Sequence, residues 1–310
     1  MTALELPVTL PNTRQLVERQ LALWPEHTAF LARSFAERDE PSLRLTEETA
    51  TQVLTLAASR LDDCCAGYRW MCEAMLEEEL FFRRHGRYRA QNFQDVAAAI
   101  YHNAAIMRLY MDGLLLSQVF WRNHVDIARF FRGYVAGLPD PFDHLEIGPG
   151  HGLQLAYAAM DGKCRSAAAW DISDASLQST RECLDRLEVS AAVALEKRSI
   201  FDLGESGRYT SIVISEVLEH LENPAAALAG VRRNLAPGGR AFVNVPCNSP
   251  APDHIHLFSH PDDLFLMLEN AGFVVLERFA TPGTGWTMAR ALRQRLTISC
   301  AAIVTHDGGD

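Results

Sequence analysis

The chain has 310 residues, of which 48% are hydrophobic and 22% are charged, as in an ordinary globular protein. Its formal net charge of −10 argues against a broad nucleic-acid-binding surface, which would need a basic stripe. The sequence has no run of about 18 apolar residues and no basic-then-apolar N-terminus, so we expect no membrane span, no secretion signal and a cytoplasmic location.

Residues 1–138 have the hydrophobic spacing of helices and no strand pattern, which predicts an all-α domain. A long helix is predicted to begin near Thr46 and to end near Gly86, and a second helical run over 93–134 is predicted to kink at Gly113. We expect this domain to roof a substrate pocket and to form a homodimer. Most of its aromatic residues should be core, and the rest should face the pocket: Tyr101, Tyr110, Phe120, Trp121, Phe130, Phe131 and Tyr134.

Beyond Pro139-Asp-Pro141 the pattern changes to short β segments that alternate with helices, which is typical of a parallel sheet. The boundary therefore divides the chain into domains 1–138 and 139–310. Seven strands are predicted, at 144–147, 166–171, 192–197, 210–215, 240–245, 273–280 and 297–305.

The first of these strands leads into a glycine-rich turn. Gly148, Gly150 and Gly152 alternate with other residues, and a helix is predicted from Leu153. Glycines allow positive φ and a close approach of a ligand to the main chain. Glu146 precedes the turn, where a carboxylate can meet a cationic ligand. This segment resembles motif I of the class I S-adenosylmethionine (SAM) methyltransferases.

The resemblance implies a Rossmann-like, mostly parallel α/β sheet of seven strands whose last strand is antiparallel. It also implies that Glu146 and the loop hold the methionine part of SAM, and that Asp171, at the end of the second strand, accepts hydrogen bonds from the ribose hydroxyls. Ser199 stands where the family has an aspartate for the adenine, so either Ser199 or Asp202 is expected there. The other cofactor-binding residues implied are Gly148, Pro149, Gly150, Gly152, Ile172, Ile200, Ser215 and Glu216.

After the fourth strand, Glu216, Glu219 and His220 have the i, i+3, i+4 spacing of one helical face. A later loop carries His254 and His256, which should face opposite ways, so that only one enters the site. Two mechanisms follow. In the first, His254 is a general base, with Glu216 and His220 beside the acceptor. In the second, Glu216, Glu219, His220 and His254 (or His256) hold a divalent metal ion. This pattern resembles two metal-using groups, the ubiquinone-pathway O-methyltransferases and the small-RNA 3′-end 2′-O-methyltransferases.

The predicted function is methyl transfer from SAM to an oxygen, nitrogen or carbon of a small molecule in specialised metabolism, with S-adenosylhomocysteine as the product. One alternative is a peptide or an RNA end as the substrate, docked on the basic cluster Arg83–Arg89. A second is an inactive partner protein that keeps the fold, since Ser199 and Thr210 replace residues that are usually acidic in the family.

Overall fold

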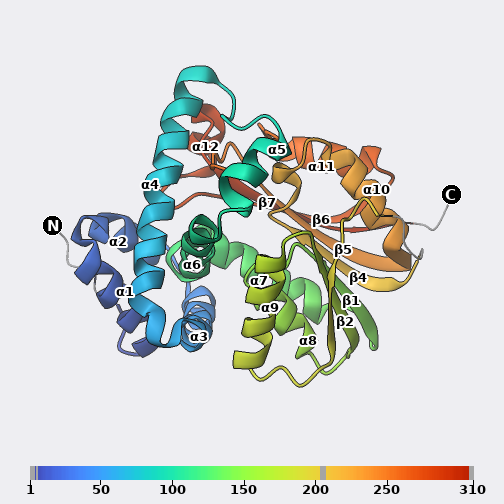
Figure 1. Ribbon diagram of the computed structural model, residues 1–310, viewed down its shortest axis with the longest axis horizontal. Coiled ribbons are helices and arrows are strands. Elements are labelled where there is room, and N and C mark those ends of the chain that lie inside the picture. Colours follow the sequence, from blue (N-terminus) through green and yellow to red (C-terminus); the bar gives the residue numbers. More distant parts are fainter. Residues whose placement is uncertain (1–3, 5, 203–206, 307–310) are drawn as a thin grey trace.

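The computed structural model describes residues 4, 6–202 and 207–306. Helices α1 to α6 form a helical layer beside the sheet, and α7 connects this layer to the first strand (Figure 1). The bounds are α1 Pro11–Leu23, α2 Thr28–Ala36, α3 Glu40–Ala57, α4 Leu61–His85, α5 Phe93–Val96, a π-helix Ala97–Tyr101, α6 Ala104–Phe120 and α7 Arg122–Ala136.

Three predicted features of these helices are wrong. The single long helix predicted from Thr46 to Gly86 is two helices, α3 and α4, separated by a 3₁₀ turn at Ala58–Arg60. Helix α3 begins at Glu40 rather than near Thr46, because the Asp39 side chain accepts a hydrogen bond from the Ser42 N–H and Pro41 suits a first turn. Gly113 lies inside α6, which continues through it without a break. A Cβ at this position would come within 2.8 Å of Met71, so the glycine permits close packing against α4. The end of α4 at Gly86, which has φ +70°, is confirmed.

All seven predicted strands are present in one sheet of order β3-β2-β1-β4-β5-β7-β6. Strand β7 is antiparallel to both β5 and β6, and the pairs among β1 to β5 are parallel. The strands are β1 Phe142–Ile147, β2 Cys164–Asp171, β3 Val193–Lys197, β4 Tyr209–Ser215, β5 Leu235–Cys247, β6 Val274–Pro282 and β7 Ile298–Thr305.

Helices cover both faces of the sheet. Leu228 of α10 and Leu264 of α11 pack with Ile212 and Ile214 on one face, and Phe131 and Tyr134 of α7 pack with Phe242 on the other. The remaining helices are α8 Leu153–Ala159, α9 Asp174–Arg186, α10 Pro224–Asn234, α11 Pro261–Asn270 and α12 Met288–Gln294. Because β1, β2, β4 and β5 are parallel, their carboxyl ends lie at a common edge of the sheet.

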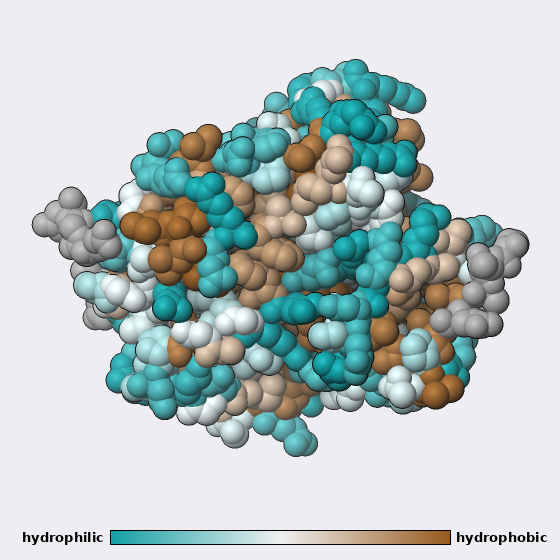
Figure 2. Space-filling view, turned by 180° about the vertical axis from the view of Figure 1, so that it is seen from behind, coloured by the Kyte–Doolittle hydropathy of each residue, from teal (hydrophilic) through white to brown (hydrophobic). Residues whose placement is uncertain are grey.

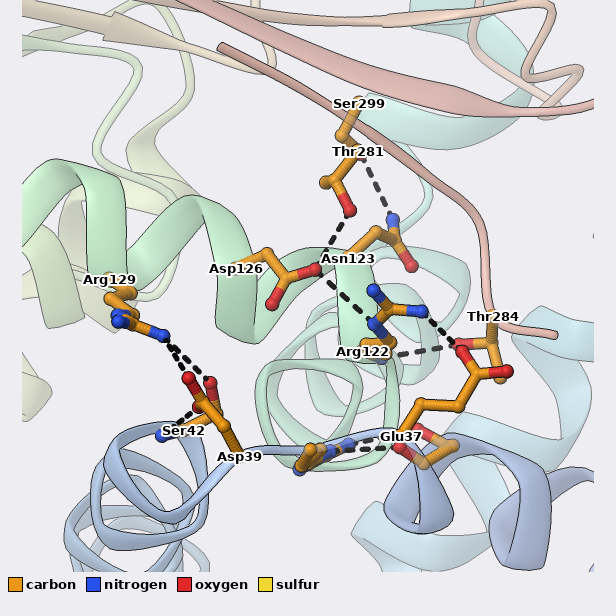
Figure 3. A network of polar contacts seen from close by, with 12 residues as sticks. Glu37, Asp39, Ser42, Arg122, Asn123, Asp126, Arg129, Thr281, Thr284 and Ser299 are labelled. Atoms are coloured by element: carbon orange, nitrogen blue, oxygen red, sulfur yellow. Dashed lines mark hydrogen bonds and ion pairs between the residues drawn. The ribbon is translucent and has the colours of Figure 1, made fainter. Parts of the chain in front are cut away.

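The helical layer and the sheet share one hydrophobic core. Tyr68 and Leu116 of the layer belong to the same buried cluster as Leu155 of α8 and Cys183 of α9. Polar contacts add to this join. Arg122 of α7 pairs with Glu37, which follows α2, and with Asp126, which accepts a hydrogen bond from Thr281 of β6 (Figure 3). The predicted boundary at 138 therefore separates segments of sequence that pack as one body.

The surface mixes hydrophilic and hydrophobic residues, with an apolar patch near the end from which the C-terminal trace leaves (Figure 2). Exposed apolar side chains include Leu76 and Leu80 of α4. The homodimer through the helical layer stays a prediction. Among the described residues, no helix combines the length and the apolar character needed to cross a lipid bilayer.

Candidate functional site

A cavity of about 750 Å³ lies between the helical layer and the carboxyl ends of the strands. Its size is within the range usual for small-molecule sites. One wall comes from the sheet and includes the glycine loop after β1, Asp171 after β2 and Glu216 after β4. The opposite wall comes from the helical layer and is largely apolar, with Met75, Phe93, Ala97, Tyr101, Met107, Tyr110, Met111, Leu114 and Trp121.

The glycine loop has three glycines with positive φ, and they serve different purposes. Gly148 (φ +68°) and Gly150 (φ +54°) line the cavity together with Pro149. A Cβ on Gly148 would lie 2.5 Å from Val217, whereas a Cβ on Gly150 would meet only Met111, at 3.9 Å. Gly152 does not line the cavity. A Cβ there would meet Thr180 and Cys183 at 3.2 Å, so Gly152 permits the close packing of α9.

Glu146 lies at the end of β1, lines the cavity and is 3% exposed. Its Oε2 has no hydrogen-bond partner within the described part of the chain, and the nearest basic nitrogen, His144 Nε2, is 4.0 Å away. Burial raises the pKa of this carboxyl well above its usual value. An unpartnered buried carboxyl beside a glycine loop suits the ammonium group of the SAM methionine, which would supply the missing charge.

Asp171 is held in place at the end of β2. Its Oδ1 accepts a hydrogen bond from the Ser173 N–H at 2.8 Å and its Oδ2 accepts one from the Ser176 hydroxyl at 2.6 Å. Burial raises the pKa of this carboxyl. Asp171 and Ile172 both line the cavity. A carboxyl fixed in this way presents its remaining lone pairs in a defined direction, as recognition of a ribose requires.

The residues predicted for the adenine are not brought to the cavity. Asp202 Oδ2 accepts a hydrogen bond from the Ser199 N–H, which closes a local turn, and Ile200 is buried against Gly230. None of these three is among the described residues that line the cavity. The turn uses the Asp202 carboxylate locally, so the prediction that Asp202 moves in to replace an aspartate at Ser199 finds no support in this geometry.

The segment after β4 is not the continuous helical face that its spacing predicts. Glu216 has φ +54°, which is rare for a residue with a side chain, and only Leu218–His220 form a short 3₁₀ turn. Glu216 still faces the cavity, where its Oε1 accepts a hydrogen bond from the Asn244 side chain at 2.8 Å. Strain of this kind persists where surrounding structure enforces it, often at functional sites. Ser215 lines the cavity beside it.

Five side chains gather at the acceptor end of the cavity, and we call them the acidic pole: Glu216, Glu219, His220, Asp253 and His254. Glu219 is fully buried, and neither carboxyl oxygen has a hydrogen-bond partner among the described residues, although Oε1 lies 3.7 Å from His220 Nε2. Burial and the neighbouring Glu216 raise its pKa well above the usual value. Asp253, in contrast, accepts hydrogen bonds from the hydroxyls of Tyr110 at 2.8 Å and Tyr101 at 3.2 Å.

Both histidines of the acidic pole have a defined tautomer. His220 Nδ1–H donates to the Asp253 carbonyl at 3.0 Å, and His254 Nδ1–H donates to the Ser249 carbonyl at 2.6 Å, because a carbonyl oxygen only accepts. In the neutral imidazole, Nε2 is then the nitrogen that carries the lone pair. Burial, with His220 nearby, lowers the pKa of His254 to about 4. His256 does not line the cavity and packs on Phe258, which confirms that only one histidine of this pair enters the site.

Part of the predicted metal set comes together. Glu219, His220 and His254 each offer a ligand atom within 4.8 Å of the other two, whereas Glu216 is outside this group. One carboxylate and two imidazoles oriented by backbone carbonyls form a donor set that fits a divalent ion such as Zn²⁺.

A second group of polar side chains in the cavity was missed by the sequence reading. Gln118, Asn123 and His124 come from the junction of α6 and α7, and His151 and Gln154 come from the glycine loop and α8. His124 Nδ1 lies 3.0 Å from the Ser117 hydroxyl, and burial lowers its pKa to about 3. The only sequence signal was their position just before and just after the first strand. Asp253, next to the predicted His254, was also missed.

The basic cluster Arg83–Arg89 is engaged in structural contacts. Arg83 donates to the Gln294 carbonyl at the end of α12, and Arg89 pairs with Glu78. Neither arginine belongs to the cavity lining. These contacts favour the structural interpretation of the cluster over a docking site for a peptide or an RNA end.

A family model described as "Methyltransferase domain" matches residues 115–278, which is more than half of the chain. Among curated proteins, the chain is 32% identical over 127 residues to an uncharacterised protein of Synechococcus sp., covering 40% of this chain and 30% of that protein. It is 31% identical over 108 residues to the ubiquinone biosynthesis O-methyltransferase of Alkalilimnicola ehrlichii, covering 34% and 42%. The chain thus spans less than half the length of these relatives.

Among solved structures, the chain is similar to the N-methyltransferase NodS of Bradyrhizobium japonicum in complex with S-adenosylhomocysteine, with 16% identity, a TM-score of 0.48 and coverage of 69% of this chain and 97% of that one. It is also similar to the [4+2]-cyclase SpnF, with 16% identity, a TM-score of 0.49 and coverage of 61% and 83%. The family match includes the glycine loop, Asp171 and Glu216, all of which face one cavity at the carboxyl edge of a seven-stranded sheet. The chain therefore belongs to the methyltransferase family, and it has the Rossmann-like fold of the SAM-dependent enzymes.

Proposed function

We propose that the chain transfers a methyl group from SAM to an oxygen, nitrogen or carbon atom of a small molecule. The observation that carries this proposal is the single cavity in which the unpartnered Glu146 carboxyl, the glycine loop and Asp171 face the acidic pole. SAM, when bound, supplies a methyl group on a sulfonium and is therefore already activated. The task left to the protein is mainly to align the acceptor with the methyl group and to exclude water.

The described residues divide this task. Glu146 and the loop would hold the methionine end, Asp171 the ribose, and Ser215 with Glu216 the region between them. The helical layer covers the opposite side, where Met111, Leu114 and Trp121 would keep water from the reacting atoms. We keep the segment of Ser199 and Ile200 as the predicted binding place of the adenine. Neither residue lines the cavity.

Proton removal would fall to the acidic pole. The unprotonated Nε2 of His254 can accept a hydrogen bond from the nucleophilic group, as predicted for a general base. Burial lowers the pKa of His254 to about 4, which weakens it as a base near neutral pH. Burial raises the pKa of Glu216, so this carboxylate is better matched to neutral pH and would take up the proton with His254 and His220 as its neighbours.

The acceptor would be a small molecule, as the names of several relatives as ubiquinone biosynthesis O-methyltransferases support. Specialised metabolism as its setting is part of the same proposal. The inactive alternative loses one of its supports, because Thr210 accepts a hydrogen bond from the Asp143 N–H at 2.8 Å, a structural role outside the cavity lining.

A metal-assisted form of the reaction is the second candidate, favoured by the two unpartnered oxygens of Glu219 and the lone pairs of the two imidazoles. Glu219, His220 and His254 would hold the ion, and the ion would supply Lewis acidity to a bound hydroxyl. The measurement is transfer before and after chelation. Loss of transfer that Mg²⁺, Mn²⁺ or Zn²⁺ restores would support this form, and full activity after chelation would contradict it.

The experiment for the main proposal is a screen of small molecules with methyl-labelled SAM, in which labelled product and S-adenosylhomocysteine should form in equal amounts. Asp171→Asn should weaken SAM binding by about 10-fold or more, since a hydrogen bond to a charged group is worth about 1.5–3 kcal/mol. The control is Asp185→Asn, an exposed carboxylate on α9, which should change nothing. SAM binding that survives Asp171→Asn would contradict the cofactor site.

A further inference from the structure

We propose that the acidic pole binds the ammonium group of the methyl acceptor, which makes the acceptor an amine with an apolar body rather than an anion or a neutral molecule. This inference rests on the proposed function, because the same cavity must also hold SAM. It specifies the charge of the small molecule, which the methyltransferase fold by itself does not determine.

The charges that line the cavity are strongly unequal. Among the described residues the lining has no arginine, and its one lysine, Lys197, pairs with Asp174 at 2.5 Å. It has six carboxyl side chains: Glu146, Asp171, Asp174, Glu216, Glu219 and Asp253. An acceptor with a carboxylate or a phosphate would find one cationic side chain here, already paired, and would lie among carboxyl groups in a poorly solvated space.

Glu219 identifies where a positive group is needed. Asp174 pairs with Lys197, and Asp253 accepts two phenolic hydrogen bonds, so both are already satisfied. Glu219 is 0% exposed, neither of its oxygens has a hydrogen-bond partner among residues 6–202 and 207–306, and its Oε1 lies 3.7 Å from His220 Nε2. An unpaired buried carboxyl costs free energy that a ligand cation or hydrogen-bond donor would recover. The backbone carbonyl of Glu219 accepts from the N–H groups of Ile255 and His256, which fixes its position.

The acceptors around Glu219 match an ammonium group in number and lie close enough together to share one. One atom from each of Glu219, His220 and His254 lies within 4.8 Å of the other two, and Glu219 Oε1 lies 3.7 Å from His220 Nε2. Acceptors no more than about 5 Å apart can each lie about 2.9 Å from one nitrogen, and an ammonium group has three N–H donors, as in lysine. Both imidazoles already use Nδ1–H on a carbonyl, so in the neutral imidazole Nε2 is the acceptor.

The apolar wall next to the acidic pole indicates the rest of the ligand. Tyr101 and Tyr110 extend from the helical layer to Asp253, so their rings connect the acidic pole to the apolar wall of Met75, Phe93 and Met107. A bare metal ion would leave that wall without a partner. An amine with an aromatic or aliphatic body would use both, and the tyrosine faces would add a cation–π contribution.

The test compares three probes with the same ring, namely tyramine, 4-ethylphenol and 3-(4-hydroxyphenyl)propanoate, which are cationic, neutral and anionic near neutral pH. Each is titrated calorimetrically into the metal-free protein saturated with S-adenosylhomocysteine, whose sulfur is uncharged and cannot replace the ligand's cation. We expect tyramine to bind about 10-fold or more tightly than 4-ethylphenol and the acid to bind most weakly. Any other order overturns the inference.

Two variants locate the effect. Glu219→Gln keeps the shape of the side chain and should reduce the preference for tyramine over 4-ethylphenol to about 3-fold or less, whereas Glu277→Gln, an exposed carboxylate on β6, should leave it unchanged. A preference that survives Glu219→Gln contradicts the assignment. So does a titration in which Mn²⁺ or Zn²⁺ binds tightly at this place and displaces tyramine. S-adenosylhomocysteine binding is measured first in every variant, so its absence counts against the proposed function, and its presence confines a failure to this inference.

Discussion

At the scale of single residues, the backbone conformation of the glycine loop depends on the absence of a side chain at Gly148. Gly148→Ala must place a Cβ 2.5 Å from Val217 at φ +68°. We expect it to lower the free energy of unfolding by about 1–3 kcal/mol and to weaken SAM binding. Both are measured by urea unfolding and calorimetry.

The matched control is Gly162→Ala. Gly162 lies in the turn before β2, and a Cβ there would meet nothing within 4 Å. It should change the free energy of unfolding by less than about 1 kcal/mol. Equal effects of the two substitutions would show that the close approach at Gly148 has no special role.

His144 gives a prediction for pH. It is fully buried in β1, where its Nδ1 lies 2.9 Å from the Ser211 hydroxyl, and burial lowers its pKa to about 3. The unfolded chain has the ordinary value of about 6.5, so between these two values the unfolded state binds a proton that the native state does not. The contribution of His144 to the free energy of unfolding should therefore be constant above pH 6.5 and fall below it, by up to about 1.4 kcal/mol per pH unit.

Urea unfolding of the wild type and of His144→Asn between pH 7.5 and 4.5 measures this contribution as a difference in slope. The variant should have the shallower dependence, while His85→Asn, at the exposed end of α4, should match the wild type. Identical slopes for all three proteins would mean that His144 takes up a proton in the native state.

At the scale of elements, α7 holds the cavity and the helical layer in register. Its first turn carries Asn123 and His124 into the cavity, and Asp126 joins Arg122 to Thr281 of β6 (Figure 3). Asp126→Ala should lower the free energy of unfolding by about 1–3 kcal/mol, because it leaves the part-buried Thr281 hydroxyl without its acceptor and removes one of the two carboxylates that pair with Arg122.

Arg129→Ala serves as the comparison on the same helix. Its ion pair with Asp39 is about half exposed on both sides, so its loss should cost less than about 1 kcal/mol. Urea unfolding distinguishes the two. If Arg129→Ala is the more damaging substitution, the network of Asp126 does not stabilise the join between α7 and β6.

The elements also show what the sequence could and could not predict. The seven strands were predicted because buried parallel strands leave short apolar runs between helical segments. The start of α3 was missed because it depends on the capping side chain of Asp39, which outweighs the hydrophobic spacing. The unusual φ of Glu216 has no sequence signal, since any residue can stand at a strained position that tertiary contacts enforce.

At the scale of the whole molecule, the site could be predicted only on its sheet side. Glu146, Gly148, Gly150, Asp171, Glu216 and His254 line the cavity as predicted from motif spacing. Gln118, Asn123 and Asp253 reach it through the packing of α6, α7 and the loop after β5, and contacts between distant segments leave no local pattern. The aromatic residues of the helical layer divide between the cavity and the core. Tyr101, Tyr110 and Trp121 line the cavity, whereas Phe120 and Tyr134 are core.

The shared core predicts cooperative unfolding. Because Tyr68 and Leu116 pack in one cluster with Leu155 and Cys183, the intact chain should unfold in a single calorimetric transition. The fragment 139–310 lacks α7 and would expose the face of the sheet around Phe242, so we expect no cooperative transition from it. A fragment that unfolds as sharply as the intact chain would show that residues 139–310 fold independently, as the predicted division into two domains implies.

The central claim is that the glycine loop and Asp171 form a working SAM site, and calorimetric titration of the intact protein with SAM tests it most directly. Gly150→Asp is the decisive variant, because aspartate tolerates φ near +54° and its Cβ has room, yet its carboxylate would enter the cavity. Gly162→Asp is its control. We predict saturable binding to the wild type and to the control, and none to Gly150→Asp; a wild type that binds no SAM, or a Gly150→Asp variant that binds it equally well, would contradict the account.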